Sequence, residues 1–461
     1  MLRRALMPLA GAALAALFGA DALAQAKTEI TFARFFGACE GDYGTSQDVA
    51  KARGECGVMT TLVNLFNATN KDNIVVKPQI IEWGPYYQQF NARIAAKDIP
   101  TIAVMHAAQL GDYTRYVEEL DDVLKEAGID AGDFTPNARS AVTVGGKIYA
   151  MPWDTHSWLW HFNIGLFKQA GLVDANGQPL VPKTVDEMLA HAKQMKEKTG
   201  KPYIIMATAG SGDFANGARG YYSWLYDQGG SIFPDGFEKA NFKTPASLAA
   251  FGVFEKLAKG EFITKGLDGS GGLGGFMNGI GAIYMTGTWR IDDFLAASAK
   301  PGGALSEGYT TRVFPNLFQS QSVWTDNHSW VLPKGGTTPA NRKAALTFLK
   351  FLWDHNFDWA RGGGHLPARQ SLMADYGKLP LRQYVVDIPT FGKALPHEVR
   401  RQFGFQNMIG EEIANMVNAG KTAEQAADAA QERSVALLRG RYETGKHFIF
   451  CKKRSKKTLS A

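Results

Sequence analysis

Long apolar runs are scarce in this chain of 461 residues. The main one, residues 5–20, is shorter than the roughly 20 apolar residues that a membrane-spanning helix needs. Arg3 and Arg4 precede it, and Ala22-Leu23-Ala24 follows it, which is the pattern of a secretory signal peptide. We therefore expect cleavage near Ala24, removal of residues 1–24 and a periplasmic mature protein. No Cys follows the cleavage site, so a lipid anchor is not supported.

Cysteine is equally scarce, with three residues in the whole sequence. In an exported chain, we expect Cys39 and Cys56 to form a disulfide around the polar insert between them, which would stabilise the fold by about 3 kcal/mol. A metal site is the weaker alternative, because two thiols without a nearby His or a further Cys are too few ligands. Cys451 stands alone near the C-terminus.

The common motifs of nucleotide, zinc, serine-hydrolase and calcium chemistry are also missing. Residues 269–274 (GSGGLG) match GxGxxG, but the preceding segment is a poor strand and no ribose-binding acid follows. His156 and His161 are five positions apart, which does not place them on one helical face. We expect hydrogen bonding from these histidines, and we expect no metal ligand, no cofactor and no catalytic residue.

Positive charge outside the C-terminal tail is balanced by negative charge. The formal net charge is +6, and the tail 446–461 carries six Lys and Arg residues. A short basic cluster at a chain end is usually a solvated, disordered segment. The composition therefore indicates no nucleic-acid partner.

Short apolar strands alternate with amphipathic helices, which predicts an α/β fold with a parallel, doubly wound sheet. Strands are expected at residues 29–33, 73–83 and 101–106, with helices at 58–66 and 86–96 between them. Ligands bind at the carboxyl ends of such strands, so residues 35–38, Trp83 and His106 are candidates by position. The further elements that we expect are a helix after Thr184, a strand at 201–208, a helix at 244–260, strands at 280–286 and 329–332, and a helix opening at Thr338.

Aromatic and polar residues alternate over residues 149–162, between a predicted strand at 146–151 and a helix. A ring face stacks on the C–H face of a sugar ring, while Asp, Arg, Asn and His bond the edge hydroxyls. Other tryptophans lie in apolar periodic segments and are assigned to the core. The tryptophans expected to face a ligand, each beside Gly or polar residues, are Trp83, Trp158, Trp224 and Trp289.

Five segments in order carry a resemblance to a known family: GGKIYAMPWDTHSWLWHFNIGLFKQAGL, GIGAIYMTGTWRIDDF, HSWVLPKG, KAALTFLKFL and GGGHLPARQS. The mature chain resembles the family 1 extracellular solute-binding proteins of bacterial ABC importers, the maltose-binding-like group. The resemblance implies the type II periplasmic-binding-protein fold, with two hinge-linked α/β lobes and a ligand cleft between them. The lobes would be 25–150 with 316–352, and 151–310 with 359–445, joined by crossings near 149–153, 309–315 and 352–358.

The resemblance also implies a set of ligand-binding residues. These are Trp83, His106, Asp154, His156, Trp158, Trp224, Trp289, Arg290, His328, Gly364, His365 and Arg369. Glycine at 362–364 would let backbone approach the ligand without a Cβ in the way.

The function that the resemblance implies is a monomeric, non-catalytic binder of a mono- or oligosaccharide that delivers its cargo to the membrane permease subunits of an ABC importer. One alternative is another cargo, namely a polyol, a glycerophosphodiester or an acidic sugar, because Arg361 and Arg369 suit an anion. A second alternative is a periplasmic glycoside hydrolase that uses Asp154 and one further carboxylate.

Overall fold

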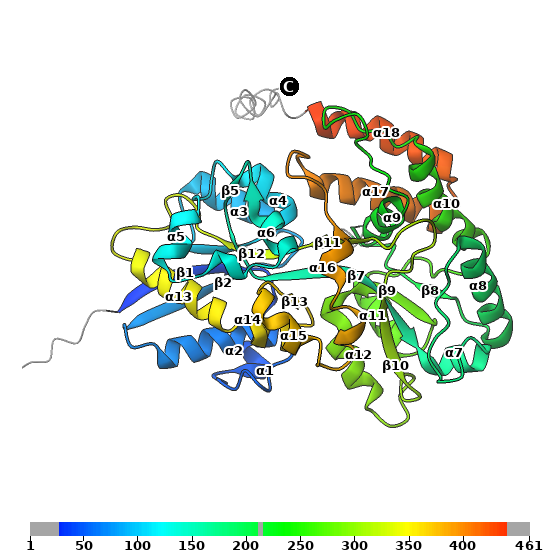
Figure 1. Ribbon diagram of the computed structural model, residues 1–461, viewed down its shortest axis with the longest axis horizontal. Helices are drawn as coiled ribbons and strands as arrows, with labels where there is room; N and C mark the ends of the chain where they lie inside the picture. The colour runs from blue at the N-terminus through cyan, green and yellow to red at the C-terminus, as the bar shows by residue number, and fades with distance from the viewer. Residues whose placement is uncertain (1–26, 211–214, 440–461) are drawn as a thin grey trace, which may run out of the picture.

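Two α/β lobes lie side by side in the computed structural model, which describes residues 27–210 and 215–439 (Figure 1). Each lobe has its own sheet and its own apolar core. The predicted two-lobed fold is therefore confirmed. The signal-peptide segment, Cys451 and the basic tail lie outside the described residues. Within the described ranges, no helix is both long enough and apolar enough to cross a membrane.

The first lobe is built on a five-stranded sheet in the order β2-β1-β3-β12-β6. Its strands are β1 (Thr28–Arg34), β2 (Ile74–Ile80), β3 (Ile102–His106), β6 (Met151–Pro152) and β12 (His328–Val331). β1 is parallel to β2 and β3, as the alternation predicts, whereas β12 is antiparallel to both β3 and β6. β6 and β12 are the strands that connect this lobe to the other one.

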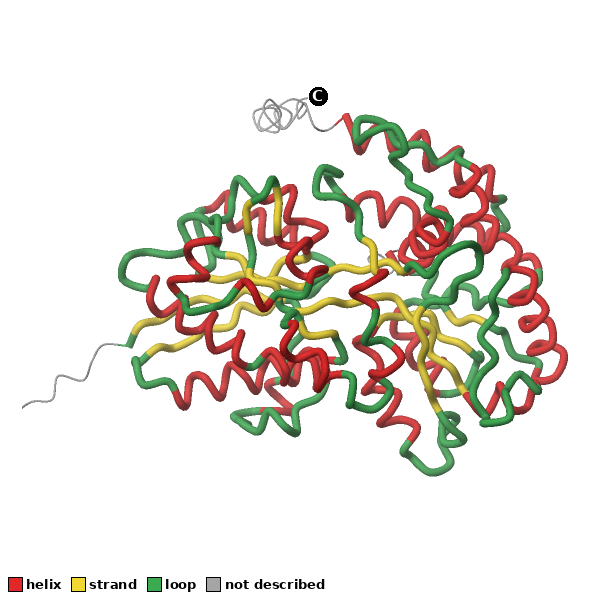
Figure 2. Tube along the Cα trace, in the orientation of Figure 1, coloured by secondary structure: helices red, strands yellow, loops and turns green. Residues whose placement is uncertain are grey.

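Helices lie on both sides of this sheet (Figure 2). They include α1 (Glu40–Tyr43), α2 (Gly54–Thr69), α3 (Tyr86–Ala96), α4 (Ala107–Tyr113), α5 (Asp121–Glu126), α6 (Pro136–Val142), α13 (Arg342–Asp354) and α14 (Asn356–Gly363). A small hairpin of β4 (Thr143–Val144) and β5 (Lys147–Ile148) follows α6. Leu62 and Phe66 of α2, Phe90 of α3 and Phe348 of α13 are buried in one core, so the apolar helix faces cover the sheet as the periodicity predicts.

The second lobe is organised around β7 (Asp154–Asn163), whose ten residues are all buried. β7 pairs with β9 (Ile283–Gly287), β10 (Tyr309–Val313), β11 (Val323–Asp326) and β13 (Leu366–Pro367), and β8 (Ile204–Ile205) and β14 (Gly392–Lys393) complete the sheet. Its helices include α7 (Ile164–Ala170), α8 (Val185–Thr199), α9 (Ala215–Asp227), α10 (Pro245–Lys259), α11 (Gly269–Met277), α12 (Ile291–Ser298), α15 (Met373–Tyr376), α16 (Ile388–Phe391), α17 (Gln402–Ala419) and α18 (Ala423–Arg439). The short 3-10 turns are at Ala131–Asp133, Thr288–Arg290, Gln370–Leu372 and Arg382–Tyr384.

Within residues 27–210 and 215–439, three segments connect the lobes. Trp153 joins β6 to β7, Asn327 joins β11 to β12, and Gly364 follows α14 and leads into β13. The first of these positions lies at the end of the predicted 149–153, and the third comes a few residues after 352–358. The second crossing differs from the predicted 309–315, because residues there form β10 and pair with β7.

This difference moves one lobe boundary. Leu317, Val323 and Trp324 pack in the second core, although the predicted boundary placed residues from 316 onward in the first lobe. The segment enters the first lobe only at His328, the first residue of β12.

Several predicted elements keep their bounds. α3 covers residues 86–96, and α8 begins after Thr184, whose Oγ1 accepts from the backbone N–H of Glu187 at 3.1 Å. The strand predicted at 201–208 contracts to β8. The helix predicted from Thr338 begins only at Arg342, because Thr338 and Asn341 form a hydrogen-bonded turn first.

Candidate functional site

A cavity of about 270 Å³ lies between the two lobes. The first lobe contributes Phe35, Glu55, Trp83, His106 and His328 to its lining, and the second contributes His156, Asn216, Arg219, Gly269, Tyr284, Thr286, Trp289 and Arg290. The wall is therefore aromatic and polar in alternation, with several histidines and two arginines.

Strand ends bring the histidines together. His106 ends β3, and His328 begins β12 directly opposite it in the antiparallel pair. On β7, Asp154 and His156 are two positions apart and so share one face of the strand. Because β7 starts where the two lobes meet, that face is turned toward the β3–β12 pair. The His156 and His328 ring centroids are 4.3 Å apart.

Asp154 is the buried anchor of this group. Its Oδ1 contacts His156 Nδ1 at 3.1 Å and accepts from the His328 backbone N–H at 3.1 Å. Its Oδ2 contacts His328 Nδ1 at 2.8 Å and accepts from Trp359 Nε1 at 2.8 Å. Burial alone would raise the pKa of the Asp154 carboxyl, but His328, His365 and His156 together hold that pKa well below its usual value. Asp154 is therefore a carboxylate that orients two imidazole rings.

The histidines differ in their protonation. Burial lowers the pKa of His156 to about 3 and that of His106 well below its usual value, and the positive charge of His328 adds to both shifts. Burial would also lower the pKa of His328, but the adjacent Asp154 carboxylate outweighs burial and raises it. Two of the rings are therefore neutral near pH 7, while His328 holds a proton more readily.

His365 links the site to the disulfide-bonded insert. Its Nε2 lies 2.9 Å from Glu55 Oε1, and its Nδ1 lies 3.2 Å from Thr288 Oγ1. Glu55 precedes Cys56, and the Cys39–Cys56 disulfide is present, with a Cα–Cα distance of 5.8 Å. The predicted disulfide is confirmed, and it fixes the start of the helix that presents Glu55 to the cavity.

Aromatic rings close the cavity from both lobes. Trp83 belongs to the first lobe, and Trp289 belongs to the second and lies 5.9 Å, centroid to centroid, from His156. Phe403 of α17 reaches from the second lobe to within 5.0 Å of the His106 ring and 6.2 Å of the Trp83 ring, centroid to centroid. The guanidinium of Arg219 stacks on Trp289 at 5.5 Å. The Phe403 contacts join the two lobes at this edge of the cavity.

Six of the predicted ligand-binding residues line this cavity: Trp83, His106, His156, Trp289, Arg290 and His328. Asp154 and His365 lie directly behind the lining and hold residues that reach it. Whether these residues contact a ligand stays a prediction.

The other predicted ligand-binding residues lie elsewhere. Trp158 is fully buried behind the Arg219 guanidinium, at 5.2 Å, and Trp224 is fully buried in α9 between Phe254 and Phe314. Trp224 fills the core because every residue of α9 except Asn216 is buried, so the polar neighbours that suggested a loop belong to a buried helix.

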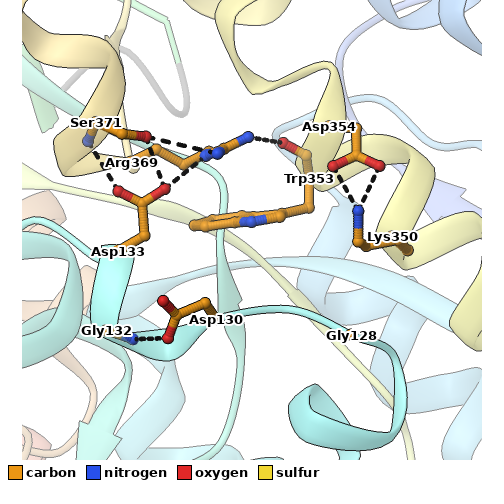
Figure 3. Close-up of a pocket in the computed structure, with 9 residues that line it drawn as sticks. All are labelled: Gly128, Asp130, Gly132, Asp133, Lys350, Trp353, Asp354, Arg369 and Ser371. Carbon is orange, nitrogen blue, oxygen red and sulfur yellow. Dashed lines mark hydrogen bonds and ion pairs between the residues drawn. The ribbon is translucent and has the colours of Figure 1, made fainter.

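Gly364 and Arg369 serve structural contacts. A Cβ on Gly364 would approach the Thr288 carbonyl oxygen to 2.5 Å, and φ there is +83°. Glycine at this position therefore lets two backbones of different lobes meet, rather than a backbone and a ligand. Arg369 lies in a separate groove on the first lobe, where its Nε donates to Asp133 Oδ2 at 2.8 Å and its guanidinium stacks on Trp353 (Figure 3).

Sequence reasoning missed several lining residues: Glu55, Asn216, Arg219, Gly269, Tyr284 and Thr286. Phe35 was a candidate by position only. Tyr284 and Thr286 alternate along β9 and could have been found from strand periodicity. Glu55 had no sequence signal, because only the tertiary approach of α2 to His365 brings it to the site.

The sequence matches the family model of the bacterial extracellular solute-binding proteins over residues 61–378. No functionally curated protein matches it. Among solved structures, the maltose-bound MalE3 of T. maritima is similar at 16% identity and a TM-score of 0.72, over 89% of this chain and 100% of that one. A chitin oligosaccharide binding protein gives 20% identity and a TM-score of 0.73, over 90% and 100%. The sugar-binding protein MalE of Xanthomonas citri gives 20% and 0.70, over 90% and 98%.

Proposed function

The chain belongs to the bacterial extracellular solute-binding protein family, and from this premise we propose that it is the substrate-binding component of an ABC importer with a short carbohydrate as its cargo. The sugar binds in the cavity between the lobes, and the closed protein then delivers it to the membrane permease subunits. The protein acts as a monomer in the periplasm and performs no catalysis.

One observation carries the carbohydrate assignment: Trp83 and Trp289 enter the same cavity from opposite lobes, with hydrogen-bonding groups between them. Flat rings suit the C–H faces of a sugar ring, and His106, Asn216 and Thr286 offer partners for its hydroxyls. A ligand that touches both lobes stabilises the closed arrangement in proportion to its preference for it. The wall chemistry and the two-lobed geometry therefore support the same kind of cargo.

Cavity size supports a short cargo. The volume of about 270 Å³ lies at or just below the lower end of the roughly 300–1,000 Å³ of pockets for drug-sized ligands. A mono- or disaccharide fits such a space better than a longer chain does. Longer oligosaccharides would require a wider separation of the lobes.

Calorimetric titration with a panel of mono- and disaccharides tests the proposal. Trp83→Ala and Trp289→Ala should each weaken the binding of the preferred sugar about tenfold or more, since each removes one stacking face. Arg369→Ala is the matched control, because Arg369 lies in the outer groove and should leave affinity unchanged. Binding of an amino acid or a polyamine in the absence of any sugar binding would overturn the proposal.

An acidic sugar is a second candidate cargo, because Arg219 and Arg290 both line the cavity. Guanidinium groups bind carboxylates and phosphates with two parallel hydrogen bonds. The panel should therefore include a uronate and a sugar phosphate. Affinity that falls steeply with salt and is lost in Arg290→Ala would favour the acidic cargo over a neutral sugar.

The buried position of Asp154 supports binding without hydrolysis. Asp154 is fully buried, and its two oxygens already accept four hydrogen bonds. A carboxylate so engaged is a poor acid or nucleophile for a glycosidic bond. Release of reducing sugar on long incubation, lost in Asp154→Asn, would instead establish a hydrolase.

A further inference from the structure

Four of the chain's nine histidines converge at the lobe junction: His106, His156, His328 and His365. They come from β3, β7, β12 and the segment after α14, so four separate parts of the chain bring them together. Two carboxylates, Asp154 and Glu55, contact them directly. A neutral sugar does not require so many imidazoles in one place.

Three of the rings have the spacing of metal ligands. One ring nitrogen from each of His106, His156 and His328 lies within 4.8 Å of the others. Nitrogens bound to one tetrahedral ion at 2.0–2.1 Å are about 3.3 Å apart, so the rings need to move inward by no more than about 1.5 Å.

The second nitrogen of each ring is already held by an oxygen. His156 and His328 place Nδ1 against the two oxygens of Asp154, and His106 places Nδ1 2.8 Å from the Tyr87 hydroxyl. An ionised carboxylate only accepts, so a hydrogen on each Nδ1 points at Asp154. The Tyr87 oxygen accepts from the His106 backbone N–H at 2.8 Å, and its second lone pair can accept from His106 Nδ1.

This arrangement leaves Nε2 as the nitrogen available on each of the three rings. Within the described part of the chain, none of these three Nε2 atoms makes a hydrogen bond, although all three residues line the cavity. A ring that carries its hydrogen on Nδ1 has the lone pair that can bind a cation on Nε2.

The outer contacts match those of known metal sites. Metal-binding histidines usually donate their other N–H to a carboxylate or another oxygen, which fixes the ring and raises its basicity. Asp154 does this for two rings, and it is itself oriented by Trp359 Nε1 and by the His328 backbone N–H.

We propose that His106, His156 and His328 bind one divalent transition-metal ion through their Nε2 atoms at the wall of the interlobe cavity. Three imidazoles with no thiolate suit zinc and its neighbours, nickel, cobalt and copper, rather than calcium or magnesium. Three protein ligands leave a coordination position open toward the cavity, where an oxygen of the cargo or a water completes the shell. The sequence-based expectation of no metal ligand rests on the missing zinc motifs, the shortage of thiols and the spacing of His156 and His161. Those two histidines share one strand, whereas this site draws on three strands.

The proposed metal site depends on the positions of the three histidines and not on the identity of the cargo. Protein purified without a histidine tag is first stripped with a chelator. Zinc, nickel and cobalt are then titrated separately against a chromogenic competitor. We expect one ion per chain, bound stoichiometrically at micromolar protein, and for cobalt the intense visible absorption of a tetrahedral site.

Substitutions at the three proposed ligands and at Asp154 test where the ion binds. His106→Gln, His156→Gln and His328→Gln should each weaken binding by about 100-fold or more, and Asp154→Asn, which removes an outer contact, by about 10- to 100-fold. His191→Gln on α8 is the matched control and should bind as the unchanged protein does. Absence of binding for all three ions, or binding that survives all three histidine substitutions, would overturn the proposal.

A measurement on the unchanged protein covers the case in which a variant fails to fold. X-ray absorption of the zinc- or cobalt-loaded protein should show scattering from three imidazole rings, and a shell of oxygens alone would overturn the site. Sugar titrations with and without the ion separate the two proposals. Ion binding without sugar binding contradicts only the carbohydrate assignment, whereas sugar binding by a protein that takes no ion contradicts only the metal site.

Discussion

Asp154 is the residue on which the geometry of the site depends most. It is fully buried, and its carboxylate joins β7 of the second lobe to β12 and α14. A buried charge is stable only when it is fully paired, so loss of part of this set of hydrogen bonds leaves polar groups without partners.

Asp154→Asn should therefore lower the free energy of unfolding by about 3 kcal/mol or more, because the amide nitrogen cannot accept from His328 or Trp359. Urea denaturation at neutral pH measures the change. Asp133→Asn is the matched control, since its contact with Arg369 is partly exposed and should contribute no more than about 1 kcal/mol. Equal effects of the two substitutions would contradict the role given to Asp154.

The burial of His161 predicts how the free energy of unfolding depends on pH. It is fully buried on β7, with Nδ1 2.7 Å from the Tyr309 hydroxyl, and burial lowers its pKa to about 3. Below the unfolded pKa of about 6.5, the unfolded chain takes up a proton at this residue and the folded chain does not. Stability is therefore lost as pH falls, by about 1.4 kcal/mol per pH unit between about 6.5 and 3.

His161→Gln should remove that part of the slope while keeping a partner for Tyr309. Free energies of unfolding of both proteins at pH 7.5 and pH 5 measure the difference. The unchanged protein should lose about 2 kcal/mol more than the variant between these values. Other buried histidines contribute equally to both proteins and cancel in the comparison, so parallel losses would contradict the buried neutral state of His161.

At the scale of elements, the helices were easier to predict than the central strand. α3 and α8 have one buried face, so their apolar residues repeat at helical spacing. β7 is covered on both faces, and its ten residues are all buried, so apolar and polar residues show no strand alternation. The same burial explains Trp224, whose polar neighbours lie in a helix that is covered almost all round.

The residues of the site also divide into those that a local sequence pattern predicts and those that only tertiary packing brings to the cavity. His106 and Trp83 could be predicted because they lie at or shortly after the ends of recognisable strands of one local β-α-β pattern. Glu55 and Arg219 could not, since only the tertiary placement of α2 and α9 brings them to the cavity. Arg369 was misplaced because the turn after β13 directs it to Asp133, away from the lobe junction.

Glycines in α14 set how closely that helix approaches α2. A Cβ on Gly362 would meet Val58 Cγ2 at 2.5 Å and the Ala52 carbonyl oxygen at 2.9 Å, whereas a Cβ on Gly363 would meet no atom closer than 3.5 Å. Gly362→Ala should therefore lower the free energy of unfolding by about 1–3 kcal/mol through overpacking. Gly363→Ala, the matched control, should be neutral or stabilising by up to about 1 kcal/mol, because alanine favours helix. Thermal and urea denaturation of both variants measure this, and equal effects would contradict the close α2–α14 contact.

At the scale of the whole molecule, contacts from α17 link the lobes independently of any ligand. Phe403 packs on Trp83, Tyr87 and His106, with ring centroids 5.0–6.2 Å apart. Nearby, the backbone N–H of Arg401 donates to Asp112 Oδ2 at 2.8 Å. Because these contacts join the two lobes, separation of the lobes would break them, so they favour the present arrangement before cargo arrives.

Phe403→Ala should shift the unliganded protein toward the open state. The apparent dissociation constant is the intrinsic one divided by the closed fraction, so sugar affinity should fall about fivefold for each 1 kcal/mol of lobe contact that is lost. Small-angle scattering should show a larger radius of gyration for the unliganded variant than for the unchanged protein. With saturating sugar the two radii should become equal, because the ligand restores closure.

The radius of gyration and the sugar affinity together distinguish a role of Phe403 in lobe closure from a direct contact with the cargo. Loss of affinity with no change in the unliganded radius would mean that Phe403 contacts the cargo and does not act through closure. Val435→Ala, an exposed apolar residue on α18, is the control for non-specific effects and should change neither quantity. Since α17 belongs to the second lobe but covers the first-lobe side of the cavity, the expected outcome is that closure and cargo binding are energetically coupled through this one helix.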